Sequence, residues 1–178
     1  KLSIYQDLIE NQWYKFPNCM PTMNMLNTKY VISGDPALDT VVNKAALGNV
    51  WFVKGVQYEK GPAEVMKSLD NFNPKDTAII ELKDKIESLN DVQVDEAAQI
   101  TLVNNNNDEV NYKSNSTKKQ LAVFSEIYYK QGWKAYIDNV EAPIVKANYV
   151  LRALVVPSGT HAIRFEFKPT TIKTSIVA

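Results

Sequence analysis

Cysteine, histidine and long hydrophobic runs are all scarce in this chain of 178 residues. The single cysteine, Cys19, allows no disulfide within the chain, so nothing points to an oxidising compartment, and we expect it to be a small buried apolar side chain. One cysteine and one histidine, His161, cannot supply the ligands of a zinc site, so no metal is predicted. No segment approaches the roughly 18 consecutive apolar residues of a membrane-spanning helix.

An excess of charge of one sign is also lacking, because Lys plus Arg and Asp plus Glu each number 20. Nucleic-acid-binding proteins usually carry a basic excess or stripe, so the composition argues against a nucleic-acid partner. No signal peptide is recognisable at the start, and the glycines do not form a phosphate-binding loop. We therefore expect an ordinary globular domain without a cofactor.

Short β-branched and aromatic runs, separated by turn residues, dominate the second half of the chain. They predict about seven strands at roughly ten-residue spacing, which is typical of a β-sandwich. The predicted strands cover residues 98–103, 109–114, 120–126, 133–137, 142–146, 150–157 and 161–168. Alternation of apolar and polar side chains within them predicts sheets that are buried on one face.

The first half of the chain contains the helical patterns. Helices are predicted over residues 1–14 and 62–69, and a single helical turn within 85–89. Pro17 and Pro21 predict a loop after the first helix. Strands are predicted over residues 29–33, 50–56 and 77–82, the first closed by a turn at 34–36.

These patterns together predict a mainly β fold with a few N-terminal helices, of the α+β class, built on an antiparallel, jelly-roll-like β-sandwich. Residues 1–90 form a helix-containing part that packs on the sheet, and residues 91–178 form the sandwich part of one compact unit. The chain begins inside a helical pattern and stops inside a strand-like one, so we interpret it as a piece of something larger.

No catalytic set is recognisable in the sequence. His161 starts a strand directly after a turn, where a surface position is expected. Glu126 and Asp138 flank an aromatic segment, and glycoside hydrolases use two carboxylates about 5–10 Å apart. With 20 acidic residues in the chain such a pair arises easily by accident, so a hydrolase is the least favoured hypothesis.

Aromatic residues cluster between positions 128 and 149. Sugar-binding proteins stack aromatic faces on sugar rings, and Tyr128 and Tyr136 are the candidates for an exposed platform. Trp133 alternates with Ala135 on one strand face and is expected to point inward. Arg152 is expected to pair with a carboxylate or with strand-end carbonyls, or alternatively to contact an anion or a sugar hydroxyl.

Several segments carry a family resemblance. The stretch from Tyr128 to Asn139, YYKQGWKAYIDN, resembles the "YYPGWKAYVDG" stretch of YfhO-like bacterial membrane proteins, and ANYVLRALVVPSGTH, from Ala147 to His161, is similar to that family's "ANYLLRAVYVPAGKH". Segments 5–9, 25–32 and 48–53 fit the same family. The chain departs from the pattern at Gln131 and at Asn139, where asparagine still tolerates the left-handed turn conformation.

The resemblance implies an extracytoplasmic part, near the C-terminus, of a bacterial cytoplasmic-membrane protein similar to glycosyltransferases that use lipid-linked sugars. The catalytic loops of such enzymes lie among membrane helices, so no catalytic residue transfers to this chain. We expect a non-catalytic structural or interaction module whose partner is the membrane-embedded part of its own full-length chain. The alternative is a glycan-binding accessory domain that contacts a cell-envelope polysaccharide. Tyr128, Tyr136, Asn148 and Arg152 are the candidate contacts for glycan or partner.

Overall fold

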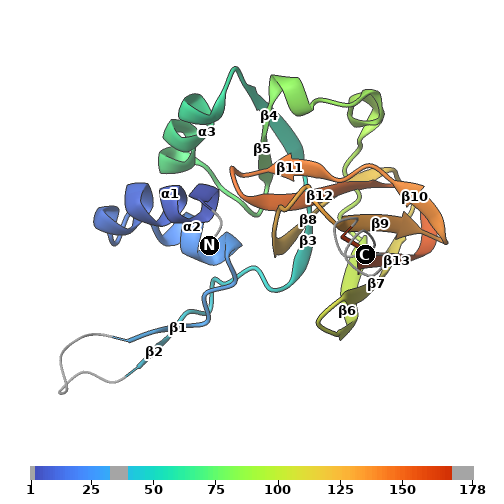
Figure 1. Ribbon diagram of the computed structural model, residues 1–178, viewed down its shortest axis with the longest axis horizontal. Coiled ribbons are helices and arrows are strands. Elements are labelled where there is room, and N and C mark those ends of the chain that lie inside the picture. The colour runs from blue at the N-terminus through green and yellow to red at the C-terminus, as the bar shows by residue number, and fades with distance from the viewer. Residues whose placement is uncertain (1–2, 33–39, 170–178) are drawn as a thin grey trace, which may run out of the picture.

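The computed structural model describes residues 3–32 and 40–169, and it confirms a mainly β, α+β fold built on an antiparallel sandwich (Figure 1). One sheet has five strands in the order β10 (Val140–Ala142), β9 (Trp133–Ile137), β13 (Gly159–Phe167), β7 (Glu109–Ser116) and β6 (Gln99–Asn105). The other has four strands in the order β11 (Val145–Ala147), β12 (Leu151–Val156), β8 (Gln120–Ile127) and β3 (Val50–Val53).

Connections between the two sheets give the sandwich its jelly-roll-like topology. The chain crosses from one sheet to the other between β7 and β8, β8 and β9, β10 and β11, and β12 and β13. The last strand, β13, is inserted between β7 and β9, with Ile163 opposite both Tyr112 and Ile137. Segments far apart in sequence therefore form the centre of the five-stranded sheet.

Aromatic rings fill the space between the sheets. Tyr112, Phe124 and Phe165 meet edge to face, with ring centroids 4.9 Å apart for Tyr112 and Phe124 and 4.8 Å for Phe124 and Phe165. All three side chains are buried. Edge-to-face pairs place the positive rim of one ring against the negative face of the next, which stabilises this core beyond its buried area.

The four-stranded sheet is buried on both faces, which the expectation of one buried face did not anticipate. In β8, Ala122 and Phe124 face the five-stranded sheet, whereas Leu121 and Val123 pack against a second core that includes Leu8 and other residues of the N-terminal part. A strand buried on both sides needs a continuous apolar run instead of alternation. The run from Leu121 to Phe124 has that composition.

The N-terminal part covers the outer face of this sheet (Figure 1). It contains α1 (Ser3–Gln12), η1 (Trp13–Lys15), α2 (Met20–Met25) and α3 (Pro62–Ser68). The expectation of a loop at Pro21 was wrong, because that proline lies in the first turn of α2, where its missing N–H costs nothing. Cys19 is buried just before α2, as expected.

Two predicted strands are each divided in two. The strand predicted at 50–56 is β3 followed by β4 (Gly55–Glu59), and the two belong to different sheets. The chain bends between them where the Lys54 and Gly55 N–H groups both donate to the Asp76 carbonyl. The strand predicted at 142–146 is interrupted by Pro143, because proline has no N–H for a strand ladder, and it forms the end of β10 and the start of β11.

The remaining elements are short. β4 pairs with β5 (Thr77–Glu81) in parallel, with α3 as the connection, so this small sheet is not antiparallel. Single turns of 3₁₀-helix form η2 (Leu69–Asn71), η3 (Leu82–Asp84) and η4 (Glu87–Asp91), the last near the predicted helical turn. β1 (Tyr30–Val31) and β2 (Val41–Val42) form a hairpin, and the predicted turn at 34–36 lies outside the described residues.

Candidate functional site

A groove lined by aromatic side chains lies where β8 leads into β9. It has a volume of about 260 Å³, and Tyr128, Tyr129 and Trp133 line it together with residues 142–144. Lys134 and Glu141 form an ion pair at 2.9 Å beside these rings. The groove thus combines flat apolar surfaces with charged hydrogen-bonding groups, the combination that binds sugar rings. We call it the aromatic groove.

The guanidinium of Arg152 stacks on the indole of Trp133, which lines this groove. The guanidinium carbon lies 4.1 Å from the centroid of the Trp133 ring, and the Nε of Arg152 donates to the Ile127 carbonyl at 3.0 Å. Ile127 ends β8, so the expected pairing with a strand-end carbonyl is confirmed. Burial lowers the pKa of the Arg152 guanidinium, whose side chain is only 3% exposed, while the charge of Glu126 opposes this change.

Gly132 sets the direction in which the chain enters β9. Its φ of +111° belongs to the left-handed half of backbone space, and a Cβ there would lie 2.8 Å from the Phe167 ring. The Gly132 carbonyl accepts a hydrogen bond from the Lys168 N–H at 2.6 Å. The Phe167 ring lies 5.3 Å from that of Trp133, so the glycine permits the close packing that holds the indole. Trp133 also packs against the core between the sheets, which confirms that it points inward.

Asn148 joins the sandwich to the small parallel sheet. Its Oδ1 accepts a hydrogen bond from the Ile79 N–H at 2.8 Å, and its own N–H donates to the Ile79 carbonyl at 2.8 Å. Asn148 and Tyr149 both have positive φ, of 49° and 71°. Asparagine adopts this conformation more readily than most residues. Its side-chain oxygen here also accepts the hydrogen bond of a buried backbone N–H in β5.

Only one of the four predicted contact residues reaches the aromatic groove directly. Tyr128 lines it, whereas Tyr136 lies elsewhere and stacks under the Arg164 guanidinium, 4.4 Å from its carbon. Asn148 and Arg152 are buried. Contact of these four residues with a glycan or partner stays a prediction.

The two carboxylates of the hydrolase hypothesis lie in different surroundings. Asp138 accepts hydrogen bonds from His161 Nδ1 at 2.6 Å and from the Ala162 N–H at 2.9 Å. Glu126 is half-buried, burial raises the pKa of its carboxyl group, and the charge of Arg152 opposes that rise. No pocket described for residues 3–32 and 40–169 is lined by both acids.

His161 is arranged as a hydrogen-bond donor and not as a base. Its Nε2 lies 3.1 Å from the Ser158 carbonyl, which can only accept, and its Nδ1 faces the Asp138 carboxylate. The hydrogen bond to Asp138 raises the pKa of His161. While both of these hydrogen bonds are made, neither ring nitrogen is free to take a proton from a nucleophile. Within the described residues, no group of three His, Cys, Asp or Glu side chains could hold a metal ion.

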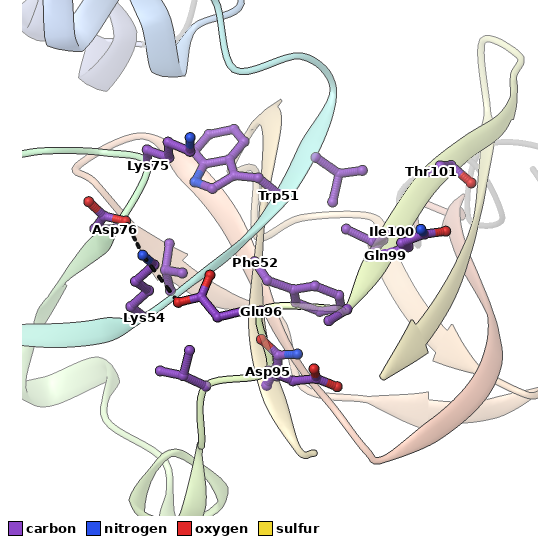
Figure 2. Close-up of a pocket in the computed structure, with 15 residues that line it drawn as sticks. Trp51, Phe52, Lys54, Lys75, Asp76, Asp95, Glu96, Gln99, Ile100 and Thr101 are labelled. Carbon is purple, nitrogen blue, oxygen red and sulfur yellow. Dashed lines mark ion pairs between the residues drawn. The ribbon is translucent and has the colours of Figure 1, made fainter. Parts of the chain in front are cut away.

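A second hollow of about 410 Å³ lies between the free edges of β3 and β6 (Figure 2). Lys54 lies there between two carboxylates, 3.5 Å from Asp76 and 3.3 Å from Glu96. Four hydrogen bonds, from Thr117, Ala97 and Ser116, lower the pKa of Asp95 to about 2. In this edge cleft Lys54, Asp76 and Glu96 are thus engaged with one another, and Asp95 is engaged with neutral donors. No motif in the sequence indicates it, because the topology creates it.

A family model described as bacterial membrane protein YfhO matches residues 66–178, well over half of the chain. The chain belongs to this family. Comparison with curated proteins and with solved structures gives no significant match. The YfhO match includes the aromatic groove, Gly132, Asn148 and Arg152. Of the helices in residues 3–32 and 40–169, none has the length and apolar character needed to cross a bilayer.

Proposed function

We propose that this YfhO-family domain is an extracytoplasmic, non-catalytic interaction module that docks on the membrane-embedded part of its own full-length chain. The full-length protein would be a glycosyltransferase that uses lipid-linked sugars. The observation that carries the docking proposal is the distribution of large exposed apolar side chains. In the described residues they gather before position 43, as Tyr5, Trp13, Tyr14, Phe16, Tyr30, Ile32, Val41 and Val42, whereas Leu82, Val94, Val103, Tyr129 and Val140 are scattered.

Part of this set lies on α1, on η1 and on the residue that follows η1. Leu8 and Gln12 of α1 are buried against the body of the domain, while Tyr5, at 36%, is exposed. The chain that continues through η1 exposes Trp13 at 53%, Tyr14 at 85% and Phe16 at 58%. We call Tyr5, Trp13, Tyr14 and Phe16 the helical docking face. Aromatic side chains grouped in this way are typical of protein interfaces.

Internal contacts of the polar family residues support a scaffold role. Asn148 is bonded to Ile79, Arg152 to the Ile127 carbonyl, and Asp138 to His161. Glu81, which is 2% exposed, is paired with Lys146 and, at 2.6 Å, with Lys83. Contacts of this kind hold a structure in place, although Nδ2 of Asn148 and Nη1 of Arg152 have no hydrogen-bond partner within the described residues.

Cross-linking in the full-length protein tests the docking. A cysteine replaces Tyr14 in a Cys19→Ser background, and Val103→Cys, on β6 and 63% exposed, is the matched control. After photo-cross-linking in membranes and protease cleavage, Tyr14→Cys should link this domain to a fragment from the membrane-embedded part. Equal yields from Tyr14→Cys and Val103→Cys, or no link from either, would refute the docking.

A glycan-binding role is the second candidate, and the aromatic groove favours it. The indole of Trp133 contacts both Arg152 and Phe167, so this part of the groove is already ordered before a sugar binds. Tyr128 and Tyr129 extend the apolar wall. Titration with cell-envelope oligosaccharides, followed by tryptophan fluorescence in a Trp13→Phe variant, tests this role.

The matched variants for the titration are Tyr129→Ala and Tyr14→Ala. Tyr129 lines the groove, whereas Tyr14 is exposed on the helical docking face. We expect Tyr129→Ala to weaken binding about tenfold, since one stacked ring contributes on the order of 1 kcal/mol or slightly more. An equal effect of the two substitutions would place the glycan elsewhere, and a flat titration of the parent protein would exclude the role.

A further inference from the structure

Cations outnumber anions among the charged side chains that line the aromatic groove, which are Lys130, Lys134 and Glu141. Both carboxylate oxygens of Glu141 accept from Lys134 Nζ, at 3.1 and 2.9 Å, so the single acid of the groove is already neutralised. Among the described residues, no carboxylate lies within ion-pair distance of Lys130. The ammonium group of Lys130 is therefore available to a ligand in the groove.

A further positive charge, that of Arg152, acts on the groove through the indole of Trp133. The guanidinium contacts this indole, which lines the groove, although Arg152 itself does not. Its Nε donates to a neutral group, the Ile127 carbonyl, and its Nη1 has no hydrogen-bond partner within the described residues. A buried charge is screened less by water than an exposed one, so Arg152 adds positive potential beside the aromatic surface.

Two acids close to the groove are paired with lysines outside it. Asp84, whose charge reaches Tyr128, lies 3.9 Å from the ammonium group of Lys146. Glu166, which neighbours the groove strand β9 in the sheet, lies 2.7 Å from that of Lys168. Residues 170–178, which follow in the sequence, contain one lysine and no acidic side chain. These acids therefore leave the positive excess of the groove in place.

Glu126 is the acid that offsets part of the Arg152 charge. The charge of each side chain opposes the effect of burial on the pKa of the other. The two do not form an ion pair in the described part of the chain, where Arg152 donates to Ile127 instead. Glu126 therefore reduces the positive potential without abolishing it, and its removal should strengthen the attraction of the groove for an anion.

We propose that the aromatic groove takes a sugar residue that carries an anionic group, a carboxylate or a phosphate ester, with its ring against Trp133 and its charge near Lys130. This inference rests on the glycan-binding role proposed above and adds the charge of the ligand to it. The volume of about 260 Å³ suits a single sugar residue with its substituents, since pockets for larger ligands measure about 300–1,000 Å³. The groove then selects by charge between sugars of equal shape.

Pairs of ligands with one shape and different charge test the proposal. Tetragalacturonic acid is compared with its methyl ester, and maltotetraose carrying a phosphate ester is compared with maltotetraose. Each is titrated into the Trp13→Phe protein and followed by tryptophan fluorescence. At low salt we expect an acid to bind about fivefold more tightly than its neutral counterpart, and the difference to shrink as salt is added. The pair that shows the larger difference distinguishes a carboxylate from a phosphate.

Substitutions that change charge at nearly constant shape locate the effect. Lys130→Gln should weaken binding of the acid about threefold and leave binding of the neutral ligand unchanged. Glu126→Gln should have the opposite sign and strengthen binding of the acid about twofold, because a charge that opposes Arg152 is removed. Lys113→Gln is the matched control, since Lys113 is exposed on β7 and does not line the groove.

The outcomes separate the charge preference from glycan binding itself. Equal affinity for the acidic and neutral members of both pairs would overturn the charge preference and leave the glycan-binding role standing. Equal effects of Lys130→Gln and Lys113→Gln would overturn the assignment of the preference to this groove. No response to any of the ligands would overturn both the inference and the glycan-binding role on which it rests.

Discussion

Replacement of Asn148 by alanine tests how the two halves of the molecule are held together. The Asn148 side chain is fully buried, its Oδ1 accepts from the Ile79 N–H at 2.8 Å, and its φ is +49°. Alanine would remove the acceptor and leave a buried N–H without its partner. It would also place an ordinary Cβ in a left-handed conformation that asparagine adopts more readily than alanine.

The expected loss is about 3 kcal/mol in the free energy of unfolding. An unsatisfied buried N–H costs about 1–3 kcal/mol, and the left-handed conformation adds about 1–2 kcal/mol for a residue with an ordinary Cβ. For a domain of this size, a melting temperature falls by about 2–4 °C for each kcal/mol. Asn148→Ala should therefore melt roughly 6–12 °C below the parent.

Asn148→Gly is the matched control, because glycine loses the same acceptor but accepts a positive φ without strain. It should melt between the parent and Asn148→Ala. Urea unfolding followed by circular dichroism gives the free energies, and calorimetry gives the melting temperatures. Unchanged stability of Asn148→Ala would refute the role of Asn148 in joining the sandwich to the small parallel sheet. Equal loss in the alanine and glycine variants would refute the assignment of strain to the backbone.

Three further predictions concern the aromatic groove and its surroundings. Gly132→Ala should destabilise more than Gly48→Ala, by about 1–3 kcal/mol in urea unfolding, because both have positive φ but only at Gly132 does a Cβ meet a ring, at 2.8 Å; equal losses would contradict this packing. Arg152→Met should lower the unfolding free energy by about 1–2 kcal/mol and alter the near-UV signal of the indole it stacks on, since a charge-assisted hydrogen bond and a cation–π contact are lost; an unchanged near-UV spectrum would contradict the stacking. The pair of His161 and Asp138 should stabilise most at mildly acidic pH. The pKa of His161 is raised, so its contribution is complete below the ordinary value of 6.5 and is lost as pH rises through the folded pKa. The pKa of Asp138 is lowered, so its contribution is present above 3.8 and is lost as pH falls through the folded pKa. The difference in melting temperature between the parent and His161→Ala, measured across this range, should peak between these limits, and a flat difference would contradict the pairing.

Local patterns predicted the elements whose sequence and environment agree. The helices near residues 1–14 and 62–69, the strand at 77–82 and most strands after residue 98 form where periodicity places them. The turn at Asp138 and Asn139 also forms as expected, with positive φ at both positions. Turn residues and apolar periodicity act over a few neighbours, which makes them readable without a structure.

The failures occur where distant contacts decide the outcome. The break after β3 depends on the carbonyl of Asp76, which lies in a loop further along the chain. This carbonyl accepts hydrogen bonds from the N–H groups of Lys54 and Gly55. The parallel pairing of β4 and β5 depends on where α3 returns the chain. Neither partner is visible in the local sequence, so a single strand was the reasonable prediction.

The candidate site shows the same division. Tyr128 was predicted near an exposed aromatic platform, and the structure places it in the aromatic groove. The burial of Asn148 and Arg152 was not predicted, because it depends on β5 and on the closing of the two sheets over one another. The edge cleft beside Lys54 left no sequence signal, because two strand edges from different sheets create it.

The sequence by itself determined the strand-rich sandwich, the turns and the family, because these follow from side-chain periodicity, backbone preference and linked motifs. Only the tertiary structure decided that the four-stranded sheet is buried on both faces and that Arg152 supports Trp133. It also decided which large apolar side chains stay exposed. Burial and stacking depend on which distant segments meet, and a linear pattern specifies only what each segment can offer.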